Sequence, residues 1–269
     1  MNRKKTNHTS VLECHKLSLA MGTRKLLSDI SLSCCSGQLT VIAGSNGAGK
    51  TTLLKTLAGI MEPDSGTACL DAQEIRFLPR LTRAKRISYL PQHGTLSWPL
   101  PVHHVVALGR LPHGETPERL TQKGHEAVKQ AIDVVGLRGF ESRAANALSG
   151  GERARALLAR VLATEADVVL TDEPVAALDP LHQYLVLDVL RREAHNGTIV
   201  ITVMHDLTLA ARFADQIILL KEGKIFQCGN PQEVLTPFSL SACFGIEAEL
   251  VTNEGIVSIL VKGPSRNVA

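Results

Sequence analysis

Residues 44–52 have the types and the spacing of a loop that binds phosphate groups. They read Gly-Ser-Asn-Gly-Ala-Gly-Lys-Thr-Thr, fit the pattern G-x-x-x-x-G-K-[ST] in full, and lie between an apolar run at 39–43 and a helical run at 52–60. A buried strand would feed the loop and a helix would follow it, so the loop amides and the positive helix end point at one place. The residues predicted to line this phosphate cradle are Gly44, Ser45, Asn46, Gly47, Ala48, Gly49, Lys50, Thr51 and Thr52.

Two side chains at the end of this loop have the chemistry to act on bound phosphates. Lys50 is predicted to reach the outer phosphates, and the hydroxyl of Thr51 is predicted to hold a magnesium ion. An ordinary glycine turn before a helix rarely has every fixed position of the pattern together with these flanks. The stretch therefore predicts a site for a nucleotide polyphosphate.

Two adjacent carboxylates follow a second apolar run, in Val-Val-Leu-Thr-Asp-Glu-Pro at 168–174. Asp172 is predicted to hold the magnesium ion through water or through Thr51, and Glu173 is placed to polarise an attacking water. On its own, such a pair is about as often an acidic cap between a strand and a helix. Because a complete phosphate loop precedes it in the chain, the catalytic interpretation is favoured here.

A serine and two glycines open a predicted long helix, in Leu-Ser-Gly-Gly-Glu at 148–152. The free amides of Gly150 and Gly151 and the positive helix end can bind a γ-phosphate. Ser149 and Glu152 also have the spacing of a capping box, and the two interpretations are compatible. A second phosphate cradle is redundant within one subunit, so it is expected to face the nucleotide of another subunit.

Three further polar residues follow apolar runs. Gln92 comes after the run at 87–90, Asp179 after the run at 175–178, and His205 after the run at 199–204. The carboxyl ends of the strands in an open α/β sheet line the ligand crevice. A single histidine in such a place is more often structural, so its functional interpretation depends on the other motifs.

The composition predicts a globular α/β protein. Hydrophobic residues make up 44%, charged residues 20% and aromatic residues only 3% of the 269 residues, so Leu, Val, Ile and Ala must form the core, as in a parallel sheet covered by helices. The six cysteines form no C-x-x-C pair, and reduced thiols are expected. The net charge of +3 is too small to indicate a nucleic-acid partner. With no signal peptide and no membrane-spanning run, any membrane association must come through a partner.

The order of elements predicts one domain over 1–269 with a mostly parallel sheet, an antiparallel β edge and an inserted helical sub-domain at 93–148. Prolines at 99, 101, 112 and 117 punctuate the insertion. Residues 231–269 are expected to form a short tail with a helical part and a hairpin near 253–255. Strands are expected at 11–19, 26–34, 39–43, 67–70, 87–90, 168–171, 198–203, 216–220 and 225–228, and helices at 52–60, 102–109, 122–135, 151–163, 181–194 and 207–213.

Taken together, these motifs resemble those of the ATP-binding-cassette ATPases, a family with a P-loop NTPase fold, over nearly the whole chain. Residues 44–52 resemble the Walker A loop, and residues 168–173 resemble the Walker B strand. Residues 148–152 look like the family signature, and residues 177–179 look like the D-loop. Gln92 and His205 match the Q-loop glutamine and the switch histidine. All six motifs stand in the order and at the spacing of the family.

The resemblance implies a head-to-tail dimer of two copies of the chain, with ATP and Mg²⁺ between the Walker A loop of one subunit and the signature of the other. Glu173 would be the base that activates water, and His205 would contact the γ-phosphate. The implied catalytic residues are Lys50, Gln92, Glu173 and His205, the implied magnesium ligands are Thr51, Gln92 and Asp172, and the residues implied to contact ATP from the partner copy are Ser149, Gly150, Gly151 and Asp179.

Residues 105–113 narrow the resemblance to one branch of the family. They look like the V-x-L-G-R-x-P-[HY] stretch of importers for ferric siderophores, haem and cobalamin. This implies an ATPase at the cytoplasmic face of the bacterial inner membrane, which contacts two permease subunits through its helical sub-domain and a periplasmic substrate-binding protein only indirectly. The permease is expected to dock near 96–104, where Trp98 is either an interface anchor or a locally packed side chain.

The cargo is expected to be hemin, because the chain is similar overall to hemin-import ATPases, including the stretch 171–179. A ferric siderophore or cobalamin is the alternative. His103, His104 and His113 are not expected to bind haem, since the ATPase subunit of such an importer does not touch the cargo. A soluble cassette ATPase acting on DNA or ribosomes is disfavoured, because the chain has a single cassette, no coiled-coil insertion and no basic arm.

The sequence departs from the family pattern where an aromatic side chain often stacks on adenine. Met21 stands there, before Gly22, so either the selectivity for adenine is weaker or another side chain, such as Arg24, covers the base. Glu152 replaces the commonest signature glutamine, a variant that importers also have, and Thr171 interrupts the apolar run before Asp172.

A weaker adenine contact predicts a small preference for ATP over GTP. The rates of hydrolysis of the two nucleotides, measured on the same preparation, should differ by less than about tenfold, since one exposed stacking contact contributes only about 0.5–1 kcal/mol. A ratio far above tenfold would argue against a weakened adenine contact.

Overall fold

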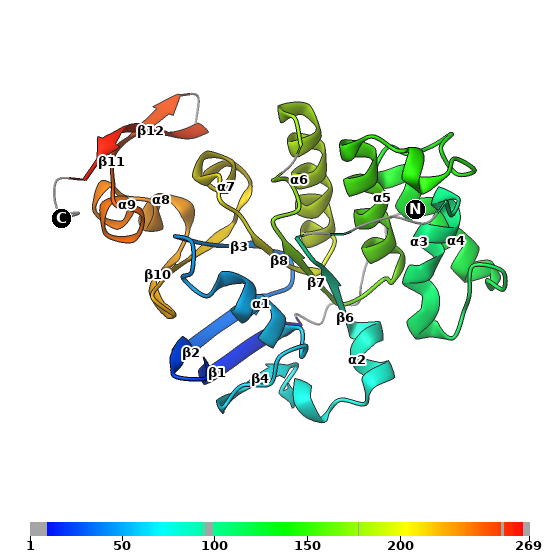
Figure 1. The fold of residues 1–269 in the computed structure, drawn as a ribbon, viewed down its shortest axis with the longest axis horizontal. Coiled ribbons are helices and arrows are strands. Elements are labelled where there is room, and N and C mark those ends of the chain that lie inside the picture. The colour runs from blue at the N-terminus through cyan, green and yellow to red at the C-terminus, as the bar shows by residue number, and fades with distance from the viewer. Residues whose placement is uncertain (1–9, 93, 95–98, 177, 254–255, 266–269) are drawn as a thin grey trace.

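In the computed structural model, helix α1 (Lys50–Leu57) lies between two β-sheets (Figure 1). The structure describes residues 10–92, 94, 99–176, 178–253 and 256–265. Side chains of α1 and of both sheets share one hydrophobic cluster, in which Leu53, Leu54 and Leu57 are fully buried. The phosphate loop at the start of α1 is therefore anchored to both sheets.

The larger sheet has the strand order β10-β9-β3-β8-β7-β6 within the described residues. The five strands from β9 to β6 are parallel, and β10 pairs with β9 in the antiparallel direction. The central strands are buried on both faces, as expected for nearly continuous apolar runs. The bounds are β3 Leu39–Gly44, β6 Ile87–Leu90, β7 Val168–Asp172, β8 Ile199–Val203, β9 Gln216–Lys221 and β10 Lys224–Gly229.

The smaller sheet is antiparallel, with the strand order β2-β1-β4-β5. It contains β1 (Val11–Met21), β2 (Arg24–Cys35), β4 (Ser65–Leu70) and β5 (Gln73–Glu74). The predicted strands at 11–19, 26–34 and 67–70 are confirmed. The two-residue strand β5 and helix α2 (Arg80–Arg86) were not predicted, because both are short and α2 has no buried side chain to give it an apolar stripe.

A group of helices lies beside strand β6, at one edge of the larger sheet, and includes most of the predicted insertion (Figure 1). It consists of α3 (Val102–Ala107), α4 (Gln122–Val134) and α5 (Gly150–Ala163), which pack on one another. The predicted helix at 102–109 ends earlier, since the chain tightens into a 3-10 turn over Leu108–His113 that contains Pro112.

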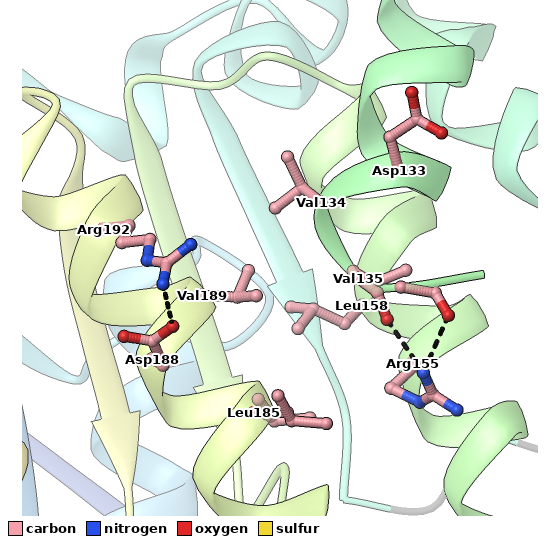
Figure 2. A pocket seen from close by; sticks show the side chains of 11 residues that line it. Asp133, Val134, Val135, Arg155, Leu158, Leu185, Asp188, Val189 and Arg192 are labelled. Atoms are coloured by element: carbon pink, nitrogen blue, oxygen red, sulfur yellow. Dashed lines mark hydrogen bonds and ion pairs between the residues drawn. The ribbon is translucent and has the colours of Figure 1, made fainter. Parts of the chain in front are cut away.

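Helices α6 (Pro180–His195) and α7 (Leu207–Phe213) connect β7 to β8 and β8 to β9. A cavity of about 170 Å³ separates α6 from α4 and α5 (Figure 2). Arg155 donates hydrogen bonds to the carbonyl oxygens of Val135 and Gly136, and Arg192 pairs with Asp188 at 2.7 Å. The charged groups at the rim therefore already have partners in the chain, and Val134, Leu158, Leu185 and Val189 give the walls an apolar character.

The tail contains α8 (Pro231–Val234), α9 (Pro237–Phe244) and a hairpin of β11 (Ile246–Asn253) with β12 (Ile256–Pro264). The predicted helical part and hairpin are confirmed, although the two residues of the predicted turn, 254 and 255, lie outside the described residues. Residues 93, 95–98 and 177 also lie outside, so Trp98 of the predicted permease contact and Ala177 of the D-loop have no structural description. Every helix in the described ranges is too short or too polar to span a bilayer.

A buried arginine joins the 3-10 turn after α3 to the end of α5. Arg110 is 1% exposed, and its guanidinium donates to the carboxylates of Glu115 and Glu165 and to the carbonyl oxygen of Ala163, at 3.0–3.1 Å. A Cβ on Gly109 would lie 2.1 Å from the Arg160 carbonyl oxygen, so only glycine allows this approach. Residues of the stretch that resembles an importer motif thus hold the helical group together.

Replacement of Arg110 by alanine should destabilise the fold strongly, by about 3–5 kcal/mol, because two buried carboxylates lose the guanidinium that balances their charge. Urea unfolding followed by circular dichroism would measure the loss. Arg138→Ala is the matched control, since Arg138 also pairs with a carboxylate, that of Asp133, but its side chain is 78% exposed. Equal losses in the two variants would contradict a structural role for the buried cluster.

Candidate nucleotide-binding site

The loop between β3 and α1 fits its surroundings only with glycine at two positions. Gly44 has a φ of 153°, and a Cβ there would lie 2.2 Å from the carbonyl oxygen of Leu220. Gly49 has a φ of 101°, and a Cβ there would lie 2.7 Å from the carbonyl oxygen of Leu26. The loop therefore runs directly against β9 and β2, which fixes its course.

The Lys50 side chain folds back over this loop. It is 6% exposed, and its ammonium donates hydrogen bonds to the carbonyl oxygens of Gly44 and Ser45 at 2.8 and 3.0 Å. Burial lowers the pKa of Lys50, while the negative charges of Glu173 and Asp172 act in the opposite direction. The loop, the lysine and both predicted carboxylates are thus parts of one electrostatic site.

Asp172 lies at the end of β7 beside the start of α1. Its Oδ1 accepts a hydrogen bond from the Thr51 hydroxyl at 3.1 Å, and its Oδ2 accepts one from the Tyr89 hydroxyl at 3.4 Å. Burial raises the pKa of Asp172, the Thr51 hydrogen bond lowers it, and the nearby charge of Glu173 raises it. Burial and the negative charge of Asp172 raise the pKa of Tyr89 to about 12, so the phenol stays a donor.

Glu173 is the residue on which the predicted strand-end side chains converge. The amide of Gln92 donates to one carboxylate oxygen of Glu173, and Nε2 of His205 bonds to the other. Because an ionised carboxylate only accepts, Nε2 of His205 carries the proton in this bond. The backbone of Glu173 has a φ of 50°, and its N–H donates to the Val203 carbonyl oxygen at 3.1 Å. This bend turns the side chain toward Gln92 and His205.

The strand order explains why these residues meet. Strands β3, β8, β7 and β6 are consecutive neighbours and parallel, so their carboxyl ends lie at one edge of the sheet. The phosphate loop leaves β3, Asp172 ends β7, and Gln92 and His205 follow β6 and β8. The structure therefore brings together these residues, which are far apart in the sequence.

A cavity of about 250 Å³ lies in front of the phosphate loop. Arg24 lies at its edge, with its guanidinium 3.5 Å from the position of a Cβ on Gly47, whereas Met21 is 67% exposed and not in the lining. Arg24 thus borders the cavity, and its contact with the base stays a prediction. The residues that line the cavity are Arg24, Leu26, Asn46, Gly47, Gly49, Lys50, Thr51, Thr52, Glu173 and His205.

Ser149, Gly150, Gly151 and Asp179 do not line this cavity of the same chain. Ser149 and Glu152 form the expected capping box at the start of α5, with Ser149 N–H donating to Glu152 at 2.7 Å. Asp179 caps α6 by accepting a hydrogen bond from the His182 N–H at 2.9 Å. The capping interpretation is confirmed for α5, the cap of Asp179 on α6 was not predicted, and the predicted contacts with ATP remain predictions for a second copy of the chain.

Two residues at the site were missed in the sequence. Tyr89 contacts Asp172 from β6, and Leu26 borders the loop from β2. Both lie in ordinary strand patterns, and only the pairing of β6 with β7 and the approach of β2 to the loop bring them there. Two histidines of the insertion have backbone partners: the ring of His103 bonds to the Glu141 carbonyl oxygen and that of His113 to the Thr164 carbonyl oxygen, each at 2.8 Å.

The model of the ABC transporter family matches residues 27–176, which is more than half of the chain. The chain belongs to the ABC transporter family. It is an ATP-binding subunit that hydrolyses ATP in transport, and its family works with membrane permeases and as dimers. The fold described above is the one expected for this family.

Curated relatives cover most of the chain. The hemin import ATP-binding protein HmuV of Pseudomonas entomophila (strain L48) is 42% identical over 88% of this chain and 93% of its own length. A probable siderophore transport system ATP-binding protein, YusV, of Bacillus subtilis (strain 168) is 38% identical over 84% of this chain and 83% of its own length. A solved ABC transporter in an inward-facing conformation has a TM-score of 0.80 at 23% identity, over 97% of this chain and 100% of that chain, which shows the shared fold.

Proposed function

We propose that this chain powers the import of hemin across the bacterial inner membrane by hydrolysing ATP on behalf of a partner permease. The observation that carries the ATPase mechanism is Glu173, whose two carboxylate oxygens are bonded by Gln92 and His205 next to Lys50. The hemin assignment is supported by the hemin import proteins that are 38–42% identical over most of the chain. The two parts of the proposal can be tested separately.

ATP would bind with its phosphates over the loop at 44–52. The loop amides and the N-terminus of α1 would bind phosphate oxygens, and the Lys50 ammonium would exchange its two carbonyl partners for the outer phosphates. The side chain of Arg24 would lie against the base or ribose at the other end of the cavity. Thr52 and Asn46 are in the cavity lining and would contact the phosphates from its sides.

Glu173 would act as the base when water attacks the γ-phosphorus of ATP. The proton of the water passes to the carboxylate, the bond to the β–γ bridging oxygen breaks, and ADP and phosphate leave. Each oxygen of Glu173 accepts one hydrogen bond, from Gln92 or from His205, and keeps a second lone pair that can take the proton of the water. His205, which is 44% exposed, would turn to the γ-phosphate and thereby couple ATP binding to activation of the base.

The residues at the end of β7 fit a magnesium ion. The Thr51 hydroxyl and the buried Asp172 carboxylate are hard oxygen ligands within 3.1 Å of each other, and burial disfavours the charge of Asp172 unless a cation offsets it. Within the described residues, no cluster of three or more His, Cys, Asp or Glu side chains forms a dedicated metal cage, as expected for an ion that keeps waters and phosphate oxygens. Mg²⁺ would neutralise charge on the β- and γ-phosphates, and Gln92 is the further candidate ligand.

A second copy of the chain would complete the site. The amides of Gly150 and Gly151 at the start of α5, the Ser149 hydroxyl and the Asp179 carboxylate lie outside the cavity that holds the phosphate loop. In a head-to-tail dimer they would contact the γ-phosphate of ATP bound by the partner. This arrangement explains why one chain carries two phosphate-binding features.

The inserted helical sub-domain at 93–148 would contact two permease subunits at the cytoplasmic face of the membrane, and the periplasmic substrate-binding protein would be reached only through the permease. The Arg110 cluster supports this role, since it makes α5 and the 3-10 turn a single rigid unit that can carry a movement from the permease to Ser149. The cargo would be recognised by the permease and the binding protein. Ferric siderophore is the alternative cargo, in line with the siderophore transport relative.

Glu173→Gln should keep ATP binding, accumulate an ATP-bound dimer, and lower turnover by about 10²–10⁴-fold, because the amide cannot accept the proton of water. Phosphate release at saturating ATP measures the turnover, and a fluorescent ATP analogue measures binding. Glu62→Gln is the matched control on an exposed glutamate away from the site. Near-normal turnover of Glu173→Gln would refute the role of Glu173 as the base.

A strain that lacks the gene should fail to grow when hemin is its only iron source. Wild-type protein should restore growth, and Glu173→Gln should not, because import requires hydrolysis. Growth on ferric citrate is the control for general fitness. Full growth of the deletion strain on hemin, in a background without a second hemin route, would reject hemin as the cargo and leave the ATPase assignment intact.

A further inference from the structure

His182, in the first turn of α6, contacts two motifs of the chain at once. Its Nδ1 lies 2.7 and 2.8 Å from the two carboxylate oxygens of Asp179, and its backbone N–H donates to the same carboxylate at 2.9 Å. On its other side the ring faces Gly151 at the start of α5. A Cβ on Gly151 would lie 3.3–3.5 Å from Cγ, Cδ2 and Nδ1 of the ring.

Because of this ring, the two glycines of the signature, Gly150 and Gly151, differ in the space available for a side chain. A Cβ added to Gly150 would have no atom of the described residues within 4 Å, so a side chain there would meet open space. At Gly151 the space is filled by His182, and a side chain would push against a ring that Asp179 holds from the other side. The packing of the His182 ring on Gly151 therefore depends on the bond between the ring and the Asp179 carboxylate.

The next residue of α6, Gln183, bonds to the other end of the segment that leads from Glu173 to Asp179. The side-chain amide of Gln183 donates to the carbonyl oxygen of Val175 at 3.3 Å, two residues after Glu173. The backbone N–H of Gln183 donates to the carbonyl oxygen of Asp179 at 2.9 Å. His182 and Gln183 thus tie α6 to both ends of the segment that leads from Glu173 to Asp179.

The His182 ring connects α5 and α6 at their N-terminal ends. Further along the two helices, Arg155 and Leu158 of α5 and Leu185 and Val189 of α6 line the cavity that separates them (Figure 2). The His182 ring lies one turn before Leu185, at the N-terminal ends of both helices. Those ends are the parts that the proposed dimer presents to the ATP of the partner copy.

We propose that His182 is a positioning residue that sets the distance between the Asp179 carboxylate and the Gly151 amide, so that both reach the ATP of the partner subunit together. The inference rests on the proposed head-to-tail dimer. Without the imidazole, Asp179 keeps its cap on α6 through the His182 backbone N–H. The first turn of α5, however, loses the ring that packs against Gly151. ATP binding to a single subunit does not involve His182, and only formation of the closed dimer does.

A simpler role would be local stability, since a histidine near a helix N-terminus that bonds the capping carboxylate also strengthens the helix. The two roles predict different results. A capping residue would lower the melting temperature and leave dimer formation by the folded protein unchanged. A positioning residue would weaken the ATP-driven dimer in protein that is fully folded and binds ATP normally.

The test uses substitutions at 182 in the full chain that also carries Glu173→Gln, with light scattering to measure the dimer formed with ATP and Mg²⁺. Asparagine keeps atoms at the places of Cγ, Nδ1 and Cδ2 and keeps a donor for Asp179, leucine keeps only the bulk, and alanine keeps neither. His182→Ala should raise the ATP concentration for half-maximal dimer about tenfold, as for a contacting pair that couples two sites. His182→Leu should be intermediate, and His182→Asn should restore most of the loss.

Binding of a fluorescent ATP analogue to dilute monomer should stay unchanged in all three variants. His195→Ala is the matched control, since His195 lies at the end of the same helix and also pairs with a carboxylate, that of Asp215 at 3.5 Å. If Glu173→Gln alone dimerises with ATP and His182→Ala has no effect, the positioning role is overturned and the proposed function stands. If Glu173→Gln alone forms no dimer, the proposed dimer falls and this inference falls with it.

Discussion

The position of Glu173 depends on the parallel order of β3, β8, β7 and β6. Its carboxylate holds Gln92 from the end of β6 and His205 from the end of β8, while Lys50 approaches from the loop after β3. None of these contacts is possible unless the four strands are neighbours with the same direction. The core packing on both faces of the sheet, with α1 on one side and α6 and α7 on the other, therefore serves the placement of one carboxylate.

A second, buried set of charges organises the helical group. Arg110 ties the 3-10 turn after α3 to the carboxyl end of α5, and the capping box of Ser149 and Glu152 orders the amino end of the same helix. Helix α5 is thus fixed at both ends by polar contacts and in its middle by apolar packing. In the proposed function, such a stiff element would transmit a movement from the permease to the nucleotide, because a loosely packed helix would absorb the movement.

Much of the fold and part of the site could be predicted from the sequence. The phosphate loop, the strand before Asp172 and the cap at Ser149 are local patterns, and the structure has these elements where the patterns predicted them. The strand order could not be predicted, since β3 pairs with β8 and β9, which come far later in the chain. For the same reason the bonds of Gln92 and His205 to Glu173, the contact of Tyr89 with Asp172 and the packing of His182 on Gly151 were not predicted. Each of these depends on side chains that only the completed fold brings together.

The left-handed backbone conformation of Glu173 lowers the stability of the fold. A φ of 50° is a conformation that glycine and asparagine adopt at lower cost than glutamate does. The Glu173 carboxylate bonds both Gln92 and His205, and in the proposed mechanism the strain is kept because this arrangement positions the base. Directed evolution that selects for heat resistance alone should therefore drift toward glycine or asparagine at 173 and yield durable proteins that no longer transport.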